Sequence, residues 1–366
     1  MNVNEFDYHL PAERIAQRPL EKRDASRMLL MDRASGLSED RMFREFAELL
    51  KGDELIVLNN ARVLPARLWG HRTGIHAQPL GKNSPIQKEN LTSAIEVLLL
   101  RKVGEDEWEA LVRPGRKISV GETIIFGSGE LKAEVLARGS YGQRKLKFTA
   151  DGNAAELIER LGHIPLPPYI KREDEPFDRE RYQTVFACSG SAVAAPTAGL
   201  HFTDLMLARL RERGIDICEI TLDVGLGTFE PVRVERLEDH RIHAESYEIP
   251  EETAAAIGRA HRNGRPIFAI GTTVVRALED AAEKASGGKP QKEPVTSGRF
   301  EAEIFLFPGK PFRVVTQLLT NFHLPRSSLL ALVAAFGGRE NVLRAYRHAV
   351  EAEYRFYSYG DCMWIR

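Results

Sequence analysis

The chain has 366 residues, 43% of them hydrophobic and 28% charged, and its 51 basic and 52 acidic side chains leave a formal charge of −1. That length favours two or three domains of about 150 residues each, and the composition is that of an ordinary water-soluble globular protein. The balance of charge excludes a simple polycation but not a nucleic-acid partner, because binding depends on local patches.

Neither a membrane segment nor a secretory leader is expected. No apolar run approaches the ~20 residues of a membrane helix, and the first residues lack the basic and then apolar start of a signal peptide. Cys188, Cys218 and Cys362 are odd in number and far apart. We therefore expect a reduced, cytoplasmic protein without a structural disulfide or zinc site.

The first 66 residues contain one clear strand. Basic and acidic side chains are interspersed through residues 14–27, a pattern typical of a solvated helical face with ion pairs, although part of the segment could face phosphates. Residues 55–58 form a continuous apolar run and predict a buried strand. The strand ends at Asn59 and Asn60, where α/β proteins often place ligand contacts, though Asn-Asn is also ordinary turn chemistry.

The pattern changes to β-type between residues 67 and 151. Short runs rich in β-formers alternate with glycine-containing turns, at residues 95–100, 108–112, 123–126, 131–136 and 145–148. Several strands at that spacing predict a small antiparallel sheet or barrel. Residues 73–93 have the composition of a long exposed loop within it.

Strand and helix signals alternate beyond residue 152. Strand-like runs at residues 215–224 and 266–270 are each followed by a helical pattern, which is typical of βα units with parallel or mixed strands. We therefore predict a mixed α/β fold. A larger, barrel-like α/β domain would be built from residues 1–66 and 152–366, with a small antiparallel β-barrel inserted at residues 67–151.

The segment 190–199 consists almost entirely of Gly, Ala, Ser, Thr and Pro, so its backbone can approach another molecule closely. It leads into Thr203, an N-cap candidate for an amphipathic helix that ends at Gly214. A small-residue loop before a helix N-terminus supplies exposed N–H groups and a partial positive charge. The segment therefore predicts either a ligand cradle or a buried crossing of two backbones.

Four segments have the same pattern, because each follows a strand-like run and places small or polar residues at the end of that run. They are residues 190–203, 223–230, 270–273 and 319–328. All four could converge on one pocket at the carboxyl edge of a sheet. The second lacks the third glycine of a dinucleotide fingerprint, and no Walker lysine follows any glycine loop, which disfavours a dehydrogenase or a P-loop kinase.

Two histidines and two carboxylates are candidates for proton transfer. His201 precedes the predicted helix and could act as a base or hold an anion, whereas His323 lies between apolar residues, as a hydrogen-bonded core histidine would. Glu230 and Glu245 are the loop carboxylates best placed for proton transfer, with capping or ion pairing as the alternative.

A metal site and a nucleophilic triad are both disfavoured. His240, His243 and Glu245 could be drawn as metal ligands, but neither H-E-x-x-H nor a cysteine partner is present, so we expect no metal. The sequence also lacks G-x-S-x-G, and no cysteine apart from Cys188 lies near a motif histidine, so nucleophilic catalysis is not indicated.

Short motifs over nearly the whole chain point to one family. They are residues 6–11 (FDYHLP), 18–19 (RP), 58–67 (LNNARVLPAR), 165–170 (PLPPYI), 182–185 (YQTV), 194–202 (AAPTAGLHF), 224–229 (VGLGTF), 271–273 (GTT), 320–325 (TNFHLP), 354–356 (YRF) and 360–361 (GD). Together they resemble the S-adenosylmethionine:tRNA ribosyltransferase-isomerase (QueA) family of the queuosine pathway.

The resemblance implies a cytoplasmic, monomeric enzyme with S-adenosylmethionine as cosubstrate, tRNA as partner and no metal. The family moves the ribosyl group of S-adenosylmethionine onto the aminomethyl-deazaguanine at the wobble position of the anticodon, and epoxyqueuosine, adenine and methionine are the products. Such chemistry needs a general base, an acid for the departing adenine and a dry pocket.

The chain departs from the family pattern at two places. Where the family usually reads T-L-H-V-G, this chain has Asp223 in place of the histidine, so Asp223 would substitute as acceptor or base. The segment 73–93 is longer than the family pattern and is expected to lie away from the chemistry.

The resemblance also suggests roles for individual residues. The proton-transfer group comprises His201 and His323, with Asp223 and Glu230 as carboxylate partners that could be the base instead. The cosubstrate site would be lined by Thr197, Gly199, Gly225, Gly227, Thr272 and Thr273. The modified base would be oriented by Asn59, Asn60 and Arg62. The tRNA backbone would be contacted by Arg113, Arg116 and Lys117, beside Arg62 and Arg67.

Two other functions remain open from the sequence. One is a non-catalytic RNA-binding protein with the β domain as its RNA-contact module, although an RNP-like aromatic pattern and a dominant basic stripe are lacking. The other is a methyltransferase that uses the same cosubstrate for a different reaction.

Overall fold

The computed structural model describes residues 1–73, 91–225, 232, 234–286 and 293–366. These residues form two compact units along a discontinuous chain. Unit 1 comprises Met1–Arg62, Pro167–Glu173 and Glu180–Arg366, and unit 2 comprises Val63–Leu166 and Asp174–Arg179. Each unit has its own sheet and is described separately below.

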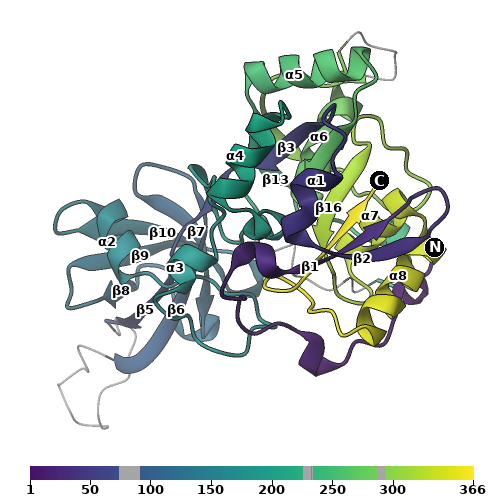
Figure 1. The fold of residues 1–366 in the computed structure, drawn as a ribbon. Coiled ribbons are helices and arrows are strands. Elements are labelled where there is room, and N and C mark those ends of the chain that lie inside the picture. The colour runs from purple at the N-terminus through teal and green to yellow at the C-terminus, as the bar shows by residue number, and fades with distance from the viewer. Residues whose placement is uncertain (74–90, 226–231, 233, 287–292) are drawn as a thin grey trace, which may run out of the picture. The chain divides into compact units, whose positions relative to one another are not determined.

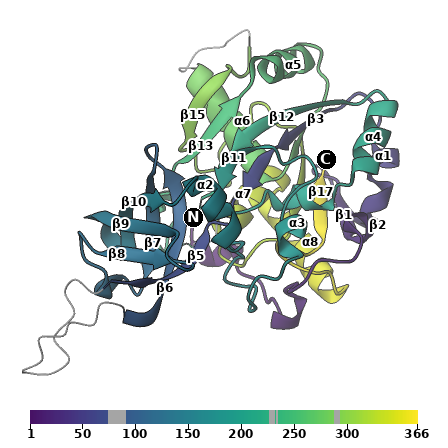
Figure 2. The same ribbon diagram turned by 90° about the vertical axis from the view of Figure 1, so that its left-hand side faces the viewer.

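Unit 1 is built on a nine-stranded mixed sheet (Figures 1 and 2). From one edge to the other its strands are β15 (Gly298–Ala302), β13 (Glu245–Ile249), β12 (Asp216–Leu222), β3 (Leu55–Asn59), β14 (Ile267–Ile270), β16 (Gln317–Asn321), β17 (Cys362–Ile365), β1 (Arg27–Met31) and β2 (Ser38–Met42). Its middle is parallel, since β12, β3, β14 and β16 all run in one direction. Their carboxyl ends therefore lie at the same edge.

Both faces of the central strands are buried, which explains why β3 reads as a continuous apolar run. All five residues of β3 are buried, and Ile56 lies between Ile217 and Phe268 of the neighbouring strands. Leu55 and Val57 belong to one hydrophobic cluster, whereas Ile56 belongs to another. Alternate side chains along the strand therefore pack into two separate cores.

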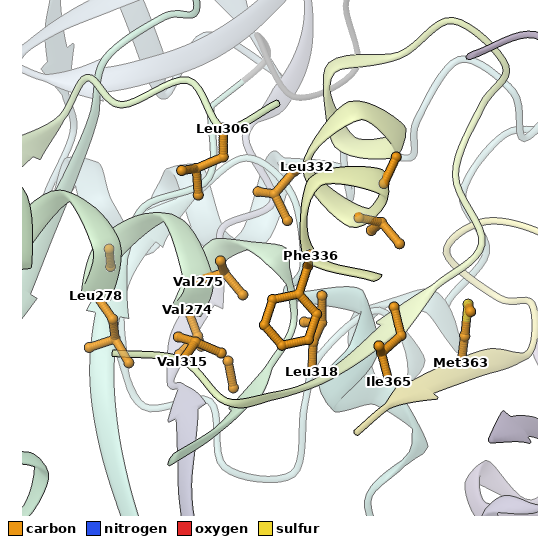
Figure 3. Packing of buried hydrophobic residues seen from close by; sticks show 14 of the residues in the cluster. Val274, Val275, Leu278, Leu306, Val315, Leu318, Leu332, Phe336, Met363 and Ile365 are labelled. Carbon is orange, nitrogen blue, oxygen red and sulfur yellow. The ribbon is translucent and has the colours of Figure 1, made fainter. Parts of the chain in front are cut away.

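Helices cover both faces. Those of the larger core are α5 (Glu251–Arg262), α6 (Thr272–Ser286), α7 (Ser328–Gly337) and α8 (Arg339–Glu351), and those of the smaller core are α1 (Phe46–Leu49) and α4 (Asp204–Glu212). Figure 3 shows Val275 of α6 and Phe336 of α7 meeting over Leu318 of the sheet. The first eleven residues of α6 are all buried, which fixes its N-terminus against the sheet.

Residues 14–27 do not form the helical face that their charge pattern suggests. Short 3-10 turns occupy Val3–Phe6, Ala12–Arg14 and Arg23–Ala25, and strands β1 and β2 follow. The expectation is wrong because arginines in this segment bond to parts of the chain remote in sequence: Arg23 donates to Leu200 O and Glu180 O, and Arg27 donates to Ala352 O. Such contacts have no signature in local periodicity.

Unit 2 contains a closed six-stranded barrel. Its strands, in order around the barrel, are β10 (Gln143–Ala150), β7 (Glu107–Arg113), β6 (Leu91–Lys102), β5 (Arg67–Arg72), β8 (Thr123–Phe126) and β9 (Leu131–Arg138). Neighbouring strands are antiparallel, and burial alternates along β7, β8 and β9. Alternate side chains fill the interior, among them Phe126 stacked on Phe148.

The remaining elements are short. They are α2 (Ala154–Leu161), α3 (Asp178–Arg181) and the two-stranded pair of β4 (Ala61–Val63) with β11 (Ser189–Ala192). The mixed α/β class and the small antiparallel barrel that the sequence predicts are confirmed. Among the residues that the structure describes, none of the helices is long and apolar enough to cross a membrane.

Candidate functional site

A pocket in unit 1 gathers residues from segments far apart in the chain. It has an empty volume of about 680 Å³, which includes solvent at its mouth. It is lined by Tyr169, Ala194, Ala195, Pro196, Thr197, Ala198, Val224, Gly271, Thr272, Thr273, Thr320, Asn321, Phe322, His323, Leu324, Ser327, Leu329, Tyr357 and Ser358. We call it the threonine pocket. Residues from all four segments that the sequence singles out meet here, and three of these segments follow β12, β14 and β16 of the parallel part of the sheet.

The N-terminus of α6 forms one wall. The chain leaves β14 at Ile270 and turns through Gly271, whose φ of +99° is a conformation that side chains rarely adopt. Thr272 and Thr273 begin the helix and line the pocket. The first N–H groups of a helix lack partners within it, and the end of the helix carries partial positive charge, so this wall favours an anionic or hydrogen-bond-accepting group.

A second helix begins at the same pocket. Ser327 is the N-cap of α7, because its hydroxyl accepts a hydrogen bond from Leu330 N at 3.2 Å and donates one to Leu324 O at 2.7 Å. Residues 322–326 connect β16 to this cap. Two buried helix N-termini therefore face one pocket.

Two stacked tyrosines form an aromatic part of the lining. The rings of Tyr169 and Tyr357 lie 4.4 Å apart at 20°, and Tyr169 Oη is 2.6 Å from Ser358 Oγ. Tyr357 has φ +71° and is 4% exposed, and its hydroxyl has no hydrogen-bond partner among the described residues. A buried hydroxyl without a partner costs free energy, which a bound molecule could recover.

His323 lines the pocket with a ring that is hydrogen-bonded at one nitrogen. Its Nε2 is 2.7 Å from Thr320 Oγ1, while its backbone is fixed by Tyr346 and Tyr8. No hydrogen bond to its Nδ1 is present in the described part of the chain. Burial lowers the pKa of His323 to about 3, so the imidazole is neutral at pH 7 and is a weaker base than an exposed histidine.

His201 does not line the threonine pocket. Its Nδ1 is 2.7 Å from Ser26 Oγ and its Nε2 is 3.3 Å from Asn321 Oδ1. Burial, together with the charges of Arg23 and Arg355, lowers the pKa of His201 to about 4. Since Asn321 lines the pocket and donates from Nδ2 to Tyr357 O at 2.8 Å, His201 contacts the pocket through Asn321.

The two asparagines at the end of β3 have their amide groups occupied. Asn59 donates to Leu222 O at 3.1 Å and accepts from Leu222 N and Ala61 N. Asn60 donates to Glu219 Oε2 at 2.9 Å and accepts from Thr221 Oγ1 at 2.7 Å. These bonds tie the end of β3 to β12, and neither asparagine is among the residues that line the pocket.

Gly199, Gly225 and Asp223 lie near the pocket but outside its lining. A Cβ at Gly199 would be 2.7 Å from the side chains of Thr184 and Phe186, so this glycine is required for packing. Gly225 N donates to Glu245 Oε1 at 2.9 Å. Asp223 lies against Gly190, because a Cβ on Gly190 would be only 2.3 Å from Asp223 Oδ1.

The other predicted residues lie elsewhere. Gly227 and Glu230 fall outside the described residues. Arg62 lies on β4 of unit 1, Arg113 ends β7, and Arg116 is exposed in the following 3-10 turn of unit 2. That turn also contains the backbone of Lys117.

Two of the three residues considered as metal ligands, Glu245 and His240, have other partners. Glu245 is buried and paired with Arg276, and the ring of His240 packs edge-on against Phe305. Within the described ranges, no group of three or more histidine, cysteine and acidic side chains is placed to hold a metal ion.

Sequence reasoning missed part of the lining. Of its polar residues, Tyr169, Tyr357 and Ser358 lie outside the four predicted segments, and Thr320, Asn321 and Ser327 lie in the segment 319–328 without a role assigned to them. Tyr169 belongs to the motif at residues 165–170, which was the available signal. Tyr357 and Ser358 follow the YRF motif at 354–356, and only the pairing of β17 with β16 brings them to this edge.

Comparison with known proteins identifies related chains. Residues 3–365 match the family model described as "Queuosine biosynthesis protein". A protein from Solibacter usitatus, named S-adenosylmethionine:tRNA ribosyltransferase-isomerase, is 53% identical over the full length of both chains. One of the same name from Moorella thermoacetica is 48% identical, also over the full length of both.

A solved structure shares the fold. The crystal structure of S-adenosylmethionine tRNA ribosyltransferase from Thermotoga maritima is 35% identical in sequence and has a TM-score of 0.52. The match covers 99% of this chain and 100% of that one.

Proposed function

The chain belongs to the queuosine biosynthesis protein family, as its motifs predict, and from that membership we propose that it is an S-adenosylmethionine:tRNA ribosyltransferase-isomerase. It transfers the ribosyl moiety of S-adenosylmethionine to a tRNA and isomerises it. In finer detail, the acceptor is 7-aminomethyl-7-deazaguanine at the wobble position, and the products are epoxyqueuosine in the tRNA, adenine and methionine. The enzyme acts as a cytoplasmic monomer and uses no metal.

The threonine pocket is the proposed cosubstrate site, and the convergence of its four segments is the observation that carries this assignment. S-adenosylmethionine has an anionic carboxylate, an ammonium group, a cationic sulfonium, two ribose hydroxyls and a flat aromatic adenine. The helix N-termini at Thr272 and Ser327 suit the carboxylate, and the threonine hydroxyls suit the ribose. The stacked pair Tyr169 and Tyr357 suits adenine and the sulfonium.

The reaction needs proton transfers but no redox step. The sulfonium acidifies the adjacent ribose carbon, a base removes that proton, and adenine departs with a proton from an acid. The amine of the modified base then attacks. Closure of the epoxide breaks the bond between the sulfonium sulfur and the ribose-derived carbon, and methionine leaves. A pocket that excludes water protects the intermediates.

We propose His323 as a proton-transfer residue, since it lines the pocket, is neutral at pH 7 and has one ring nitrogen without a partner among the described residues. His201 acts as a positioning residue through Asn321, because both of its ring nitrogens are occupied. Asp223 and Glu230 remain the proposed carboxylate partners.

The other sequence assignments are retained where the geometry suits them. Thr197, Thr272 and Thr273 contact the cosubstrate, and Gly225 lies beside it, next to Val224 of the lining. Gly227 stays an expectation of the resemblance. For Asn59 and Asn60 the occupied amides favour a role in holding strand ends together over contact with the modified base. Contacts with tRNA are assigned to Arg62, Arg113, Arg116 and Lys117.

One incubation tests the function. The protein is mixed with S-adenosylmethionine and tRNA that carries the aminomethyl-deazaguanine, and the small products are separated. Release of adenine in proportion to modified tRNA is the expected result. Formation of S-adenosylhomocysteine would instead indicate methyl transfer, and binding of tRNA without either product would indicate a non-catalytic RNA-binding protein.

A further inference from the structure

A second pocket in unit 1 is lined by basic side chains and lies next to His201. Its lining comprises Pro19, Leu20, Lys22, Arg23, Ser26, Arg181, Leu200, His201, Ser358, Tyr359 and Gly360, and its empty volume is about 300 Å³, part of it open to solvent. We call it the basic pocket. Ser358 lines both this pocket and the threonine pocket.

The two arginines of the basic pocket are held by neutral groups. Arg23 donates to Leu200 O at 3.2 Å and to Glu180 O at 2.9 Å. Arg181 donates to Leu20 O at 2.7 Å and to Glu21 O at 2.9 Å. Neither makes an ion pair with a carboxylate among the described residues, so backbone carbonyls fix both guanidinium groups without neutralising them.

The positive charge in this pocket is therefore only partly offset. Burial and the neighbouring charge of Arg181 both lower the pKa of Arg23, while the carboxylates of Glu180 and Asp204 and the hydroxyl of Tyr359 act in the opposite direction. Arg181 Nε is buried without a hydrogen-bond partner in the described part of the chain. Two like charges held together and an unused donor are costly unless an anion binds to them.

The basic pocket is connected to the threonine pocket by a short chain of hydrogen bonds. His201 faces the basic pocket and contacts Ser26 on one side and Asn321 on the other. Asn321 in turn lines the threonine pocket. An anion in the basic pocket would lie beside His201 and offset the positive charges around it.

We propose that the basic pocket binds an oxyanion, with Lys22, Arg23 and Arg181 as its cationic groups. The fixed fork of a guanidinium matches the oxygens of a phosphate or a carboxylate. The source of the anion rests on the proposed function: it is either a backbone phosphate of the tRNA or the carboxylate of S-adenosylmethionine.

Inorganic phosphate tests the site without either substrate. Thermal unfolding of the full chain is followed against phosphate concentration, with chloride keeping the ionic strength constant. The wild type should show a saturable rise in its unfolding temperature, since a ligand that binds only the folded state stabilises it. In Arg181→Gln and in Lys22→Gln the apparent affinity for phosphate should fall about tenfold, as for the loss of one charge-assisted hydrogen bond.

One variant serves as a control, and the second test variant guards against misfolding of the first. Lys51→Gln removes an exposed lysine elsewhere in unit 1 and should leave the phosphate response unchanged. Lys22 is itself exposed, so Lys22→Gln tests the pocket even if Arg181→Gln fails to fold. A wild type without a saturable phosphate response, or a response equal in all four proteins, would overturn the proposal.

The source is distinguished by two further measurements on Lys22→Gln. If the anion is a tRNA phosphate, the slope of log affinity for tRNA against log salt should become shallower by about 0.7 to 0.9, and affinity for S-adenosylmethionine should not change. If it is the carboxylate, S-adenosylmethionine should bind more weakly while its decarboxylated analogue binds as in the wild type. No change in either measurement would overturn the link to the reaction, while adenine release by the wild type tests the proposed function separately.

Discussion

His323 presents its ring to the threonine pocket in the neutral form, and this state decides what it can do in a reaction. Replacing it with glutamine keeps a polar group that can reach Thr320 Oγ1 but removes the base. We expect His323→Gln to lower kcat by about 10²- to 10⁴-fold, the usual contribution of one general acid or base. Single-turnover release of adenine measures the effect on the chemical steps.

The control for that variant is His348→Gln, which changes a partly exposed histidine that is paired with Asp40 and lies outside the threonine pocket. It should keep wild-type kcat. Isothermal titration should show that His323→Gln binds S-adenosylmethionine within a few-fold of the wild type. If His323→Gln released adenine at the wild-type rate, the assignment of proton transfer to this residue would be wrong.

The buried imidazole of His201 should make the free energy of unfolding depend on pH. Its pKa of about 4 in the folded protein lies below the usual 6.5. Between these values the unfolded state binds a proton that the folded state does not, so stability falls as pH falls from 6.5 towards 4. The contribution is up to about 1.4 kcal/mol per pH unit. Urea unfolding at pH 7 and pH 5 should show about 2 kcal/mol less acid destabilisation in His201→Gln.

A control variant at a site that does not titrate between pH 5 and pH 7 accompanies this measurement. Lys51→Gln changes an exposed residue elsewhere in unit 1 and should keep the wild-type difference in stability between pH 7 and pH 5. A wild-type pH dependence in His201→Gln as well would mean that the imidazole is not kept neutral by its surroundings.

Helix caps link local sequence to the pocket. Ser327 caps α7 and lines the pocket, whereas Thr203 caps α4 by accepting from Met206 N at 3.1 Å and is not among the residues lining it. Both Ser327→Ala and Thr203→Ala should reduce the free energy of unfolding by about 1 kcal/mol. Only Ser327→Ala should also weaken S-adenosylmethionine binding, by about fivefold. Equal binding by the two variants would show that the start of α7 does not contact the cosubstrate.

Single elements were the most predictable level of this fold. The apolar run at residues 55–58 correctly predicts β3, because a strand buried on both faces is apolar throughout. The run at residues 131–136 correctly predicts β9 of the barrel, because a strand buried on one face alternates between apolar and polar residues. The prediction for the segment 14–27 was wrong, since Arg23 and Arg27 bond to backbone carbonyls remote in sequence. The roles suggested for Asn59 and Asn60 depend in the same way on strand pairing, because their amides are occupied by β12.

At the scale of the whole molecule, the order of strands is the information that local patterns lack. β17 lies between β16 and β1, which joins the end of the chain to its beginning. That pairing brings Tyr357 and Ser358 to the threonine pocket, and no periodicity within residues 354–365 predicts it. The division into domains at residues 1–66 with 152–366 and 67–151 stays a prediction of the sequence.

The barrel of unit 2 supplies the last prediction, which concerns tRNA. Arg113 and Arg116 are exposed at the end of β7 and in the turn that follows. If they contact the RNA backbone, Arg113→Glu combined with Arg116→Glu should weaken tRNA binding. The slope of log affinity against log salt should also become shallower by about 0.7 to 0.9 for each phosphate that the variant no longer neutralises. Affinity for S-adenosylmethionine should not change, because the threonine pocket is formed by unit 1 alone.

A matched pair on the same barrel controls for net charge. Lys132 on β9 and Lys147 on β10 are exposed, and Lys132→Glu with Lys147→Glu changes the total charge by the same amount. If both double variants bound tRNA equally weakly, the effect would come from the overall field of the protein, which acts at long range and is screened by salt. Weaker binding confined to the Arg113 and Arg116 variant would instead locate a tRNA-binding surface at the end of β7.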